Sequence, residues 1–210
     1  MTAPNRLKPL TAEDFADLTA VSRETLDRLR VYAELLRRWQ SKINLVGAAT
    51  LPDLWRRHML DSAQLHPLLP IPAGHLIDLG SGAGFPGLVL AIMGVEDVEL
   101  IESDARKCAF LREAAGATAT PVAITKSRIE DAICRPAQVV TARALAPLVT
   151  LLGQVARFLA EDGVALLLKG AGVEQELTAA AKVWTMRLQR HPSRTDPSGE
   201  VLEIKGLSRG

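Results

Sequence analysis

The chain has 210 residues, a length that suits one medium-sized domain with a smaller appendage. With 48% hydrophobic residues, 23% charged residues and a formal net charge of +1, it has the composition of an ordinary globular protein, and the charge argues neither for nor against a nucleic-acid partner. No apolar run approaches the roughly 18–20 residues of a membrane span, so no membrane partner is expected. Two distant cysteines, Cys108 and Cys134, offer neither a disulfide framework nor a metal-ligand spacing, which predicts a cytoplasmic protein without a metal.

Residues 1–72 are expected to form a helical extension that packs on the rest of the chain. A short helix is predicted over 11–18, and Ser22 is expected to cap a longer second helix. Thr50 is then expected to cap a third helix that ends near His66. The second helix has one apolar face at three- to four-residue spacing, made of Leu26, Leu29, Ala33, Leu36 and Trp39.

Two basic clusters lie in this N-terminal region: Arg37, Arg38 and Lys42, and Arg56, Arg57 and His58. Basic residues on helices can follow a phosphate backbone, although most such clusters are solvated surface. His58 and Asp61 share one helical face, where they either brace the helices or touch RNA. Trp39 and Trp55 are expected to anchor the core rather than to stack on bases.

From residue 73 onward, strand and helix patterns alternate, which predicts an α/β domain over 73–210. Two final segments, 183–189 and 201–205, alternate apolar and polar residues and predict an antiparallel hairpin at the sheet edge. Parallel strands closed by such a hairpin are typical of class I methyltransferases that use S-adenosylmethionine (AdoMet), rather than of a six-stranded parallel dinucleotide fold. The expected strands are near 76–80, 98–102, 121–125, 137–141 and 163–169, and the expected helices near 87–93, 105–116, 147–160 and 173–182.

A glycine-rich turn follows the first of these strands. It fits the Asp-x-Gly-x-Gly-x-Gly loop of AdoMet methyltransferases through Asp78, Gly80, Gly82 and Gly84. The same stretch also satisfies the dinucleotide pattern Gly-x-Gly-x-x-Gly at residues 82–87. Glycines permit positive φ and close approach of the backbone to a ligand. In the methyltransferase interpretation, Asp78 ends the strand, helps to set the turn and holds the methionine amino end.

The next strand ends in an acid. Glu102 lies about 20 residues beyond the glycine turn, where a carboxylate can accept hydrogen bonds from ribose hydroxyls. The alternative is a solvated glutamate at the end of a strand. Asp104 or Ser103 is expected to cap the helix that follows.

Several further segments carry a resemblance to one family, in the right order and spacing. They are Asn44-Leu45, Arg57-His58-x-x-Asp61-Ser62, the loop Ile77–Gly87, Ser127–Asp131, Ala142-Arg143-Ala144 and Leu168-Lys169-Gly170. Together they resemble the RsmG/GidB family, the bacterial guanine-N7 methyltransferases of small-subunit ribosomal RNA, over about residues 22–205.

The resemblance implies AdoMet contacts for five residues that follow strand ends: Gly80, Phe85, Ile129, Glu130 and Arg143. Ile129 and Glu130 would flank the adenine, and Arg143 would close the site. Two structural alternatives stay open. Arg143 can instead form an ion pair with Asp78 or Glu102, and Glu130 can occupy the first turn of a helix, where an acid favours the helix dipole.

The resemblance also implies the substrate, a guanine in the 530 loop of 16S ribosomal RNA, presented as naked RNA, an assembly intermediate or the 30S subunit. Guanine N7 carries a free lone pair, so alignment rather than a general base should supply the acceleration. Arg128 and Arg143 are the expected catalytic residues, holding the guanine O6 or phosphates. One departure from the family is the stretch 197–201, which lacks the basic residue that many members carry before the last strand. A monomer is expected.

Two other functions compete with this interpretation. An NAD(P)-linked oxidoreductase would use the glycines of residues 82–87, yet the chain's one tyrosine, Tyr32, lies in the N-terminal region without a Tyr-x-x-x-Lys spacing. A non-catalytic ribosome-binding protein could retain a methyltransferase shell. The glycine loop, Glu102 and Arg143 argue against that second alternative.

Overall fold

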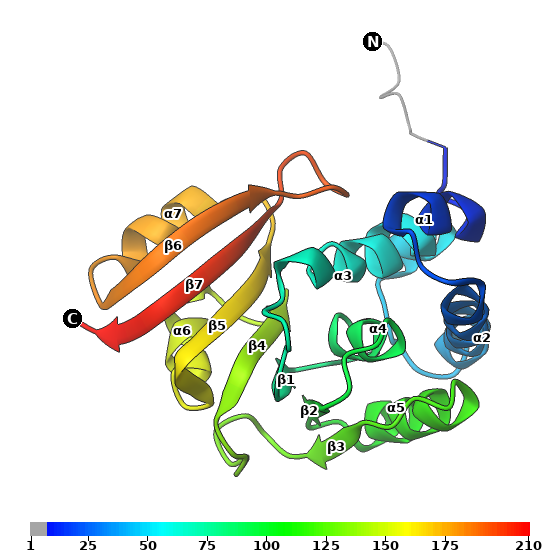
Figure 1. Ribbon diagram of the computed structural model, residues 1–210, viewed down its shortest axis with the longest axis horizontal. Coiled ribbons are helices and arrows are strands. Elements are labelled where there is room, and N and C mark those ends of the chain that lie inside the picture. Colours follow the sequence, from blue (N-terminus) through cyan, green and yellow to red (C-terminus); the bar gives the residue numbers. More distant parts are fainter. Residues whose placement is uncertain (1–7) are drawn as a thin grey trace.

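The computed structural model describes residues 8–210; the first seven residues of the expected N-terminal extension lie outside the described part (Figure 1). Its centre is a seven-stranded sheet in the order β3-β2-β1-β4-β5-β7-β6. The first five strands are parallel, β7 runs antiparallel to β5, and β6 runs antiparallel to β7, which confirms the predicted hairpin. The strands are β1 (Leu76–Leu79), β2 (Val98–Glu102), β3 (Ala123–Lys126), β4 (Ala137–Arg143), β5 (Leu159–Lys169), β6 (Trp184–Pro192) and β7 (Glu200–Arg209).

Helices cover both faces of this sheet. In Figure 1, α1, α2, α4 and α5 gather at one side of the molecule, while α6 and α7 lie with the hairpin strands. The caps predicted at Ser22 and Asp104 are confirmed, because each side chain accepts hydrogen bonds from the first turn of its helix. The helices are α1 (Ala12–Thr19), α2 (Arg23–Gln40), α3 (Asp61–Ala63), α4 (Gly87–Ile92), α5 (Ala105–Ala117), α6 (Leu148–Val155) and α7 (Val173–Ala180). None of these helices is long and apolar enough to cross a membrane.

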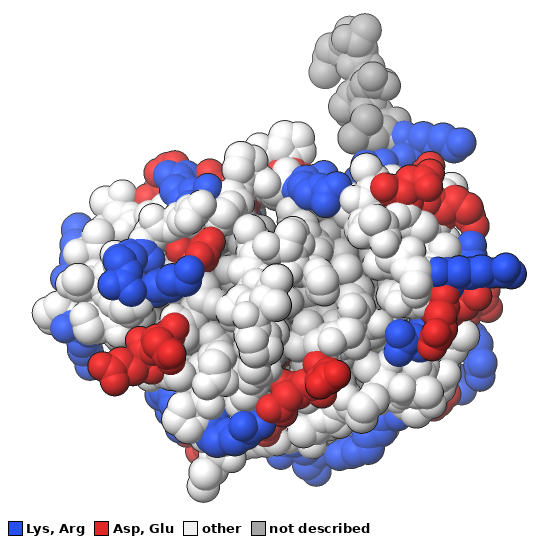
Figure 2. All heavy atoms as spheres, viewed as in Figure 1, with Lys and Arg blue, Asp and Glu red and all other residues white. Residues whose placement is uncertain are grey.

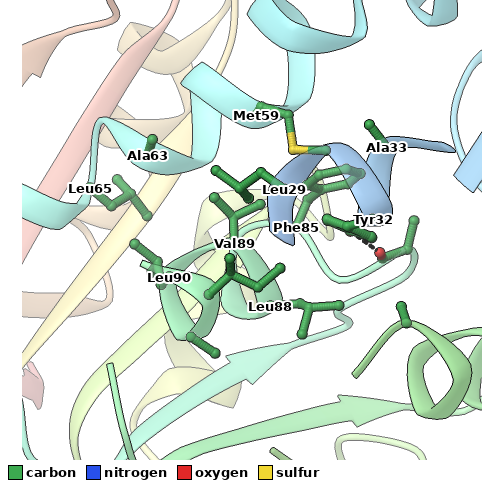
Figure 3. Close-up of a cluster of buried hydrophobic side chains, with 14 of the residues drawn as sticks. Leu29, Tyr32, Ala33, Met59, Ala63, Leu65, Phe85, Leu88, Val89 and Leu90 are labelled. Atoms are coloured by element: carbon green, nitrogen blue, oxygen red, sulfur yellow. Dashed lines mark hydrogen bonds between the residues drawn. The ribbon is translucent and has the colours of Figure 1, made fainter. Parts of the chain in front are cut away.

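Alternate residues of the strands point to opposite faces of the sheet and pack into two separate hydrophobic cores. On β1, Leu76 belongs to the core beneath α1, α2, α4 and α5, whereas Ile77 and Leu79 belong to the core beneath α6 and α7. The first core runs without a break from the N-terminal helices into α4 (Figure 3). Tyr32 of α2, fully buried there, donates a hydrogen bond to the carbonyl of Ala83 in the glycine loop. The N-terminal helices therefore support this loop directly, while the division of the chain at residue 73 stays a prediction.

The prediction of a single helix from Thr50 to His66 is wrong. The segment instead forms a 3₁₀ helix η1 (Ala48–Asp53), a π-helix η2 (Trp55–Leu60), α3 and a second 3₁₀ turn η3 (His66–Leu68). Pro52 inside η1 lacks the N–H that a regular helix needs. The hydroxyl of Thr50 caps no helix, because it donates to the carbonyl of Gly47. The wider π-helix is of a kind often found at functional sites.

Helix α6 also ends earlier than expected. It stops at Val155 instead of extending to residue 160, because β5 begins at Leu159 and is four residues longer at its start than the sequence pattern indicated. Pro86 occupies the cap position before α4, which starts at Gly87 as expected. The early end of α6 does not move the carboxyl ends of the strands.

Candidate active site

The glycine loop connects β1 to α4 at the point where the sheet order reverses between β1 and β4. Open α/β sheets bind ligands at this point. Gly80 and Gly82 both have positive φ, +62° and +58°. A Cβ on Gly80 would lie 2.5 Å from Leu145 Cδ1, whereas a Cβ on Gly82 would meet only the carbonyl oxygen of Gly80, at 3.8 Å. Gly82 therefore leaves open space for a ligand against its backbone, while Gly84 faces inward toward Tyr32.

Asp78 lies behind this loop. Its carboxylate is 0% exposed and accepts hydrogen bonds from Thr141 Oγ1 at 2.7 Å and from the backbone N–H of Gly87 at 3.2 Å. Burial raises the pKa of Asp78 to about 6, although the hydroxyl of Thr141 opposes the shift. The expected role in setting the turn is thus supported. The expected role at a methionine amino end gains no support and stays a prediction, because the side chain lines neither of the two hollows described next.

The first hollow, which we call the β2-side hollow, has a volume of about 360 Å³. Glu102, only 7% exposed, forms its base: one carboxylate oxygen accepts from Gly82 N at 2.9 Å and the other from Asp104 N at 2.8 Å. The alternative of a solvated glutamate is therefore wrong. The lining also includes Gly80, Ser127, Arg128, Ile129, Glu130 and Arg143.

Three predicted residues follow β3 in this hollow. Ile129 is buried, and its carbonyl accepts a hydrogen bond from Arg157. Glu130 lies in a turn rather than in a helix, which removes the helix-dipole alternative; its own backbone N–H and Gln154 lower its pKa. Arg128 is exposed and lines only the β2-side hollow, not the second hollow described below. Its expected contact with the substrate base therefore gains no support and stays a prediction.

The second hollow, the β5-side hollow, has a volume of about 350 Å³ and shares Gly80 and Arg143 with the first. Its walls come from three distant parts of the chain. They are the segment 45–61, the glycine loop with Phe85, and the ends of β5 and β7 with the loop between β6 and β7. Sequence reasoning had singled out residues 168–170 of this last wall but missed the part formed by the loop between β6 and β7, whose one signal was the unusual stretch 197–201.

The loop between β6 and β7 is held against η2 and α3, toward which it reaches in Figure 1. Arg57 Nη1 lies 3.3 Å from a carboxylate oxygen of Asp196. Thr195 Oγ1 donates to Asp61 Oδ1 at 2.5 Å, and the backbone N–H of Arg194 donates to Gln64 at 2.8 Å. These contacts close the β5-side hollow on the side opposite the glycine loop.

Arg143 occupies the boundary between the two hollows. Its side chain is 19% exposed; Nη1 donates to the carbonyl of Arg57 at 3.1 Å and to Asp61 Oδ2 at 3.4 Å. Nη2 lies 2.9 Å from His58 Nδ1, and the guanidinium lies 4.9 Å from the centroid of the Phe85 ring. The alternative of an ion pair with Asp78 or Glu102 is wrong, because the carboxylate partner of Arg143 is Asp61.

His58 is neutral in this environment. Burial, together with the positive charges of Arg143 and Arg57, lowers the pKa of His58 to about 3. The imidazole packs 5.0 Å from the Phe85 ring, and its Nε2 lies 2.7 Å from Thr50 Oγ1. His58 and Asp61 thus do brace the N-terminal segment, and they do so around Arg143.

The two basic clusters differ in their surroundings. Arg37, Arg38 and Lys42 are exposed at the end of α2. Arg56 is held by Asp53 and by the carbonyl of Lys8, so it is set apart from Arg57 in the hollow. On the face drawn in Figure 2, basic and acidic side chains alternate around a mostly uncharged middle, so this face carries no broad basic surface.

Both tryptophans are core anchors, as predicted. Trp55 packs on Phe15 with ring centroids 5.4 Å apart, and Trp39 packs edge-on against Phe110 at 5.7 Å. The indole N–H of Trp39 donates to Glu113. Neither ring is free to serve as a stacking platform for bases.

The sheet order, the glycine loop after β1 and the acid at the end of β2 together define a class I AdoMet-dependent methyltransferase. Solved structures agree on the fold. A TehB-like SAM-dependent methyltransferase from Corynebacterium glutamicum superposes with a TM-score of 0.57 at 15% identity, covering 83% of this chain and 96% of that one. A ribosomal protein L11 methylase from Lactobacillus delbrueckii subsp. bulgaricus gives 0.55 at 19% identity, covering 70% and 78%.

Residues 25–201 match the GidB family, described as rRNA small subunit methyltransferase G, and the chain belongs to this family. A relative of that name from Paramagnetospirillum magneticum is 60% identical over 198 residues, which cover 94% of this chain and 97% of the relative. Another from Rhodospirillum centenum is 55% identical, covering 94% and 91%. The family excludes the NAD(P)-linked oxidoreductase considered from the glycine pattern.

Proposed function

We propose that the protein transfers the methyl group of AdoMet to N7 of a guanine in the 530 loop of 16S ribosomal RNA, within the small subunit or an assembly intermediate of it. The observation that carries this proposal is the pair of hollows that meet at Gly80 and Arg143. One hollow suits a nucleoside-bearing cofactor and the other an entering base. Methyl transfer needs both reactants to meet at such a junction.

The residues of the β2-side hollow fit AdoMet. Glu102 is a carboxylate at the end of β2 within reach of ribose hydroxyls, and buried Ile129 offers an apolar surface for adenine. The uncovered backbone of Gly82 borders the neighbouring β5-side hollow and donates its N–H to Glu102, so the glycine loop lies beside the same ligand. Bound AdoMet supplies a methyl group already activated on a positive sulfonium. The residues then have to hold and align the two partners.

The β5-side hollow favours an acceptor that needs no deprotonation. Arg143 engages Nδ1 of His58, and both oxygens of Asp61 are hydrogen-bonded, one to Thr195 and one to Arg143. The other carboxylates that line this hollow, Asp196 and Glu200, are held by Arg57 and Arg190 respectively. A ring nitrogen with a free lone pair, such as guanine N7, matches a site whose acidic groups are already engaged.

Arg143 is the residue best placed to touch the acceptor. Two of its N–H groups point to Arg57 and Asp61 and one to His58, which leaves two of the five guanidinium N–H donors without a hydrogen bond to any residue from 8 to 210. Guanine O6 or a phosphate oxygen would accept from them. One chain encloses both hollows, which supports a monomer, and a ribosomal substrate implies that it acts in the cytoplasm.

The test is methylation of purified 16S RNA, assembly intermediates and 30S subunits by the purified protein, followed by mass mapping of the modified nucleotide. The expected product is N7-methylguanine at one loop position, and the best substrate among the three identifies the natural one. Methylation at another atom or only in 23S RNA would refute the proposal. Binding of RNA without methyl transfer would favour the non-catalytic alternative.

A further inference from the structure

A continuous chain of hydrogen bonds runs from Arg143 into the N-terminal segment. Arg143 Nη2 lies 2.9 Å from His58 Nδ1, and His58 Nε2 lies 2.7 Å from Thr50 Oγ1. Thr50 Oγ1 in turn lies 2.7 Å from the carbonyl oxygen of Gly47. These hydrogen bonds therefore link Arg143, which lines both hollows, to the irregular helix η1.

The chemistry of the groups fixes the direction of every bond in this chain. A guanidinium has donors only, so Nδ1 of His58 must accept with its lone pair. The imidazole proton then sits on Nε2 and is donated to Thr50, while the hydroxyl of Thr50 donates to Gly47, which can only accept. The low pKa of His58 agrees with this arrangement, since a protonated ring would point a second donor at Arg143.

We propose that His58 is a positioning residue for methyl transfer: in its neutral Nε2–H form, fixed by Thr50, it holds the guanidinium plane of Arg143 against Phe85 and aims the two remaining donors at the substrate. The π-helix η2 places His58 and the carbonyl of Arg57 so that both bind the same guanidinium. The methylation assay, which is one readout of this proposal, depends on the proposed function. The NMR measurement of the His58 tautomer does not depend on it.

Four substitutions separate the two ends of the imidazole. In His58→Asn the amide oxygen takes the place of Nδ1, and in His58→Gln the amide nitrogen takes the place of Nε2. The first keeps the acceptor for Arg143 and the second keeps only the contact with Thr50. Thr50→Val removes the acceptor that selects the tautomer, and Thr50→Ser keeps it.

Single-turnover methylation should fall about 10–100-fold in His58→Gln and less in Thr50→Val, because small displacements of an aligning group are costly. His58→Asn should recover most of the rate lost in His58→Gln, and Thr50→Ser most of that lost in Thr50→Val. A structural role would instead make His58→Asn and His58→Gln equally harmful. Thermal unfolding of each variant shows whether it is folded.

A double-mutant cycle tests whether His58 acts through Arg143. If it does, His58→Gln should lower the rate less than twofold in an Arg143→Ala background, because the residue that it positions is already gone. A full, additive loss in that background would overturn the proposal. Wild-type protein that fails to methylate any small-subunit RNA would instead overturn the proposed function.

The tautomer gives a readout that needs no substrate. The chain has four histidines, so ¹⁵N and ¹³C NMR of histidine-labelled protein, with the His58 signals assigned by their loss in His58→Asn, reports each ring directly. We expect a protonated Nε2 and an unprotonated Nδ1 for His58 from pH 8 down to about 5. A proton on Nδ1 or a charged ring at pH 6 would overturn the proposal even if the enzyme is active.

Discussion

The two hollows of the active site are built in different ways. The β2-side hollow uses mainly residues at or just after the ends of β1, β2, β3 and β4, with Lys107 and Gln154 added from α5 and α6. The β5-side hollow instead joins the segment 45–61 to residues 193–200, which lie at opposite ends of the chain. The β2-side hollow is therefore built mainly from the strand ends of the sheet, and the β5-side hollow also needs the N-terminal segment and the loop between β6 and β7.

This difference predicts how the two hollows respond to mutation. Residues of the β2-side hollow, together with the glycine loop that lies between the two hollows, should affect cofactor affinity, whereas the segment 45–61 and residues 193–200 of the β5-side hollow should affect RNA affinity. Arg143, which lines both, should affect the rate most of all. The following experiments separate these effects.

Arg143→Ala should give the largest effect, a loss of about 10²–10³-fold in single-turnover methylation, as is typical when one preorganised polar group is removed from a reaction centre. Arg30→Ala, which removes an arginine from exposed ion pairs with Glu13 and Asp27, is the matched control and should keep the wild-type rate. Near-normal turnover by a folded Arg143→Ala protein would mean that the boundary between the hollows is not the reaction centre.

Gly82→Val should weaken AdoMet binding at least about tenfold, because the new side chain would enter the open space beside the glycine loop, next to the Glu102 carboxylate that Gly82 N–H binds. Gly206→Val is the control, since its φ of +59° matches the +58° of Gly82 while Gly206 lies on β7, outside both hollows. Both variants carry the same backbone strain, so equilibrium AdoMet binding isolates the steric effect. Equal loss in both would exclude the glycine loop as the cofactor contact.

Asp78 should make stability depend on pH. Its pKa of about 6 in the folded protein lies above the ordinary 3.8, so protonation favours the folded state. The stabilisation is complete at pH values below 3.8, the pKa in the unfolded chain, and is lost as the pH rises through about 6, the pKa in the folded protein. The free energy of unfolding of the wild type, relative to Asp78→Asn, should rise by roughly 1 kcal/mol from pH 7.5 to 5. Denaturant titrations measure this difference between the wild type and Asp78→Asn. If the difference were constant with pH, the buried position of the Asp78 carboxylate would be contradicted.

Arg57 and Arg56 offer a test confined to the β5-side hollow. Arg57→Ala should weaken RNA binding a few-fold and reduce the slope of log affinity against log salt by roughly 0.7–0.9, as for one lost phosphate contact. Arg56→Ala should leave that slope unchanged, because Asp53 and Lys8 already hold Arg56. Arg37→Ala applies the same test to the exposed end of α2. An unchanged slope in Arg57→Ala would leave its ion pair with Asp196 as its only role.

The smallest effect should be that of pH on the rate. Between about pH 6.5 and 9, the single-turnover rate should vary less than twofold, because His58 is neutral throughout and N7 needs no deprotonation. RNA binding and stability are measured at each pH as controls. A steep rise with one apparent pKa would reveal a general base and would contradict a ring-nitrogen acceptor.

Local signals in the sequence located the glycine loop and the acid at the base of the β2-side hollow. Gly80, Gly82 and Glu102 are recognisable because glycine conformations and strand-end acids follow from short stretches of chain. The caps at Ser22 and Asp104 are equally local and are confirmed. What these signals could not predict is which way each group faces, and so Asp78 turned out to lie behind the loop.

Local sequence signals could not predict the β5-side hollow. The bond from Thr195 to Asp61 joins residues 134 positions apart, and no short pattern encodes it. The irregular helices η1 and η2 arise because Pro52 and the contacts of Thr50 and His58 compete with regular helical bonding, a tertiary effect that periodicity cannot anticipate. Arg143 was identified by family resemblance, but its partners were visible only in the fold.

The contacts between Arg57 and Asp196 and between Asp61 and Thr195 also set an order of events during synthesis. The chain leaves the ribosome from its N-terminus, so the residues of the β2-side hollow are free to fold while β6, β7 and the loop between them are still being made. A nascent chain at that stage has the residues of the β2-side hollow, an unpaired edge on β5 and no β6–β7 wall for the β5-side hollow, the hollow that we propose receives RNA. The capacity to hold substrate therefore arrives only with the last part of the polypeptide.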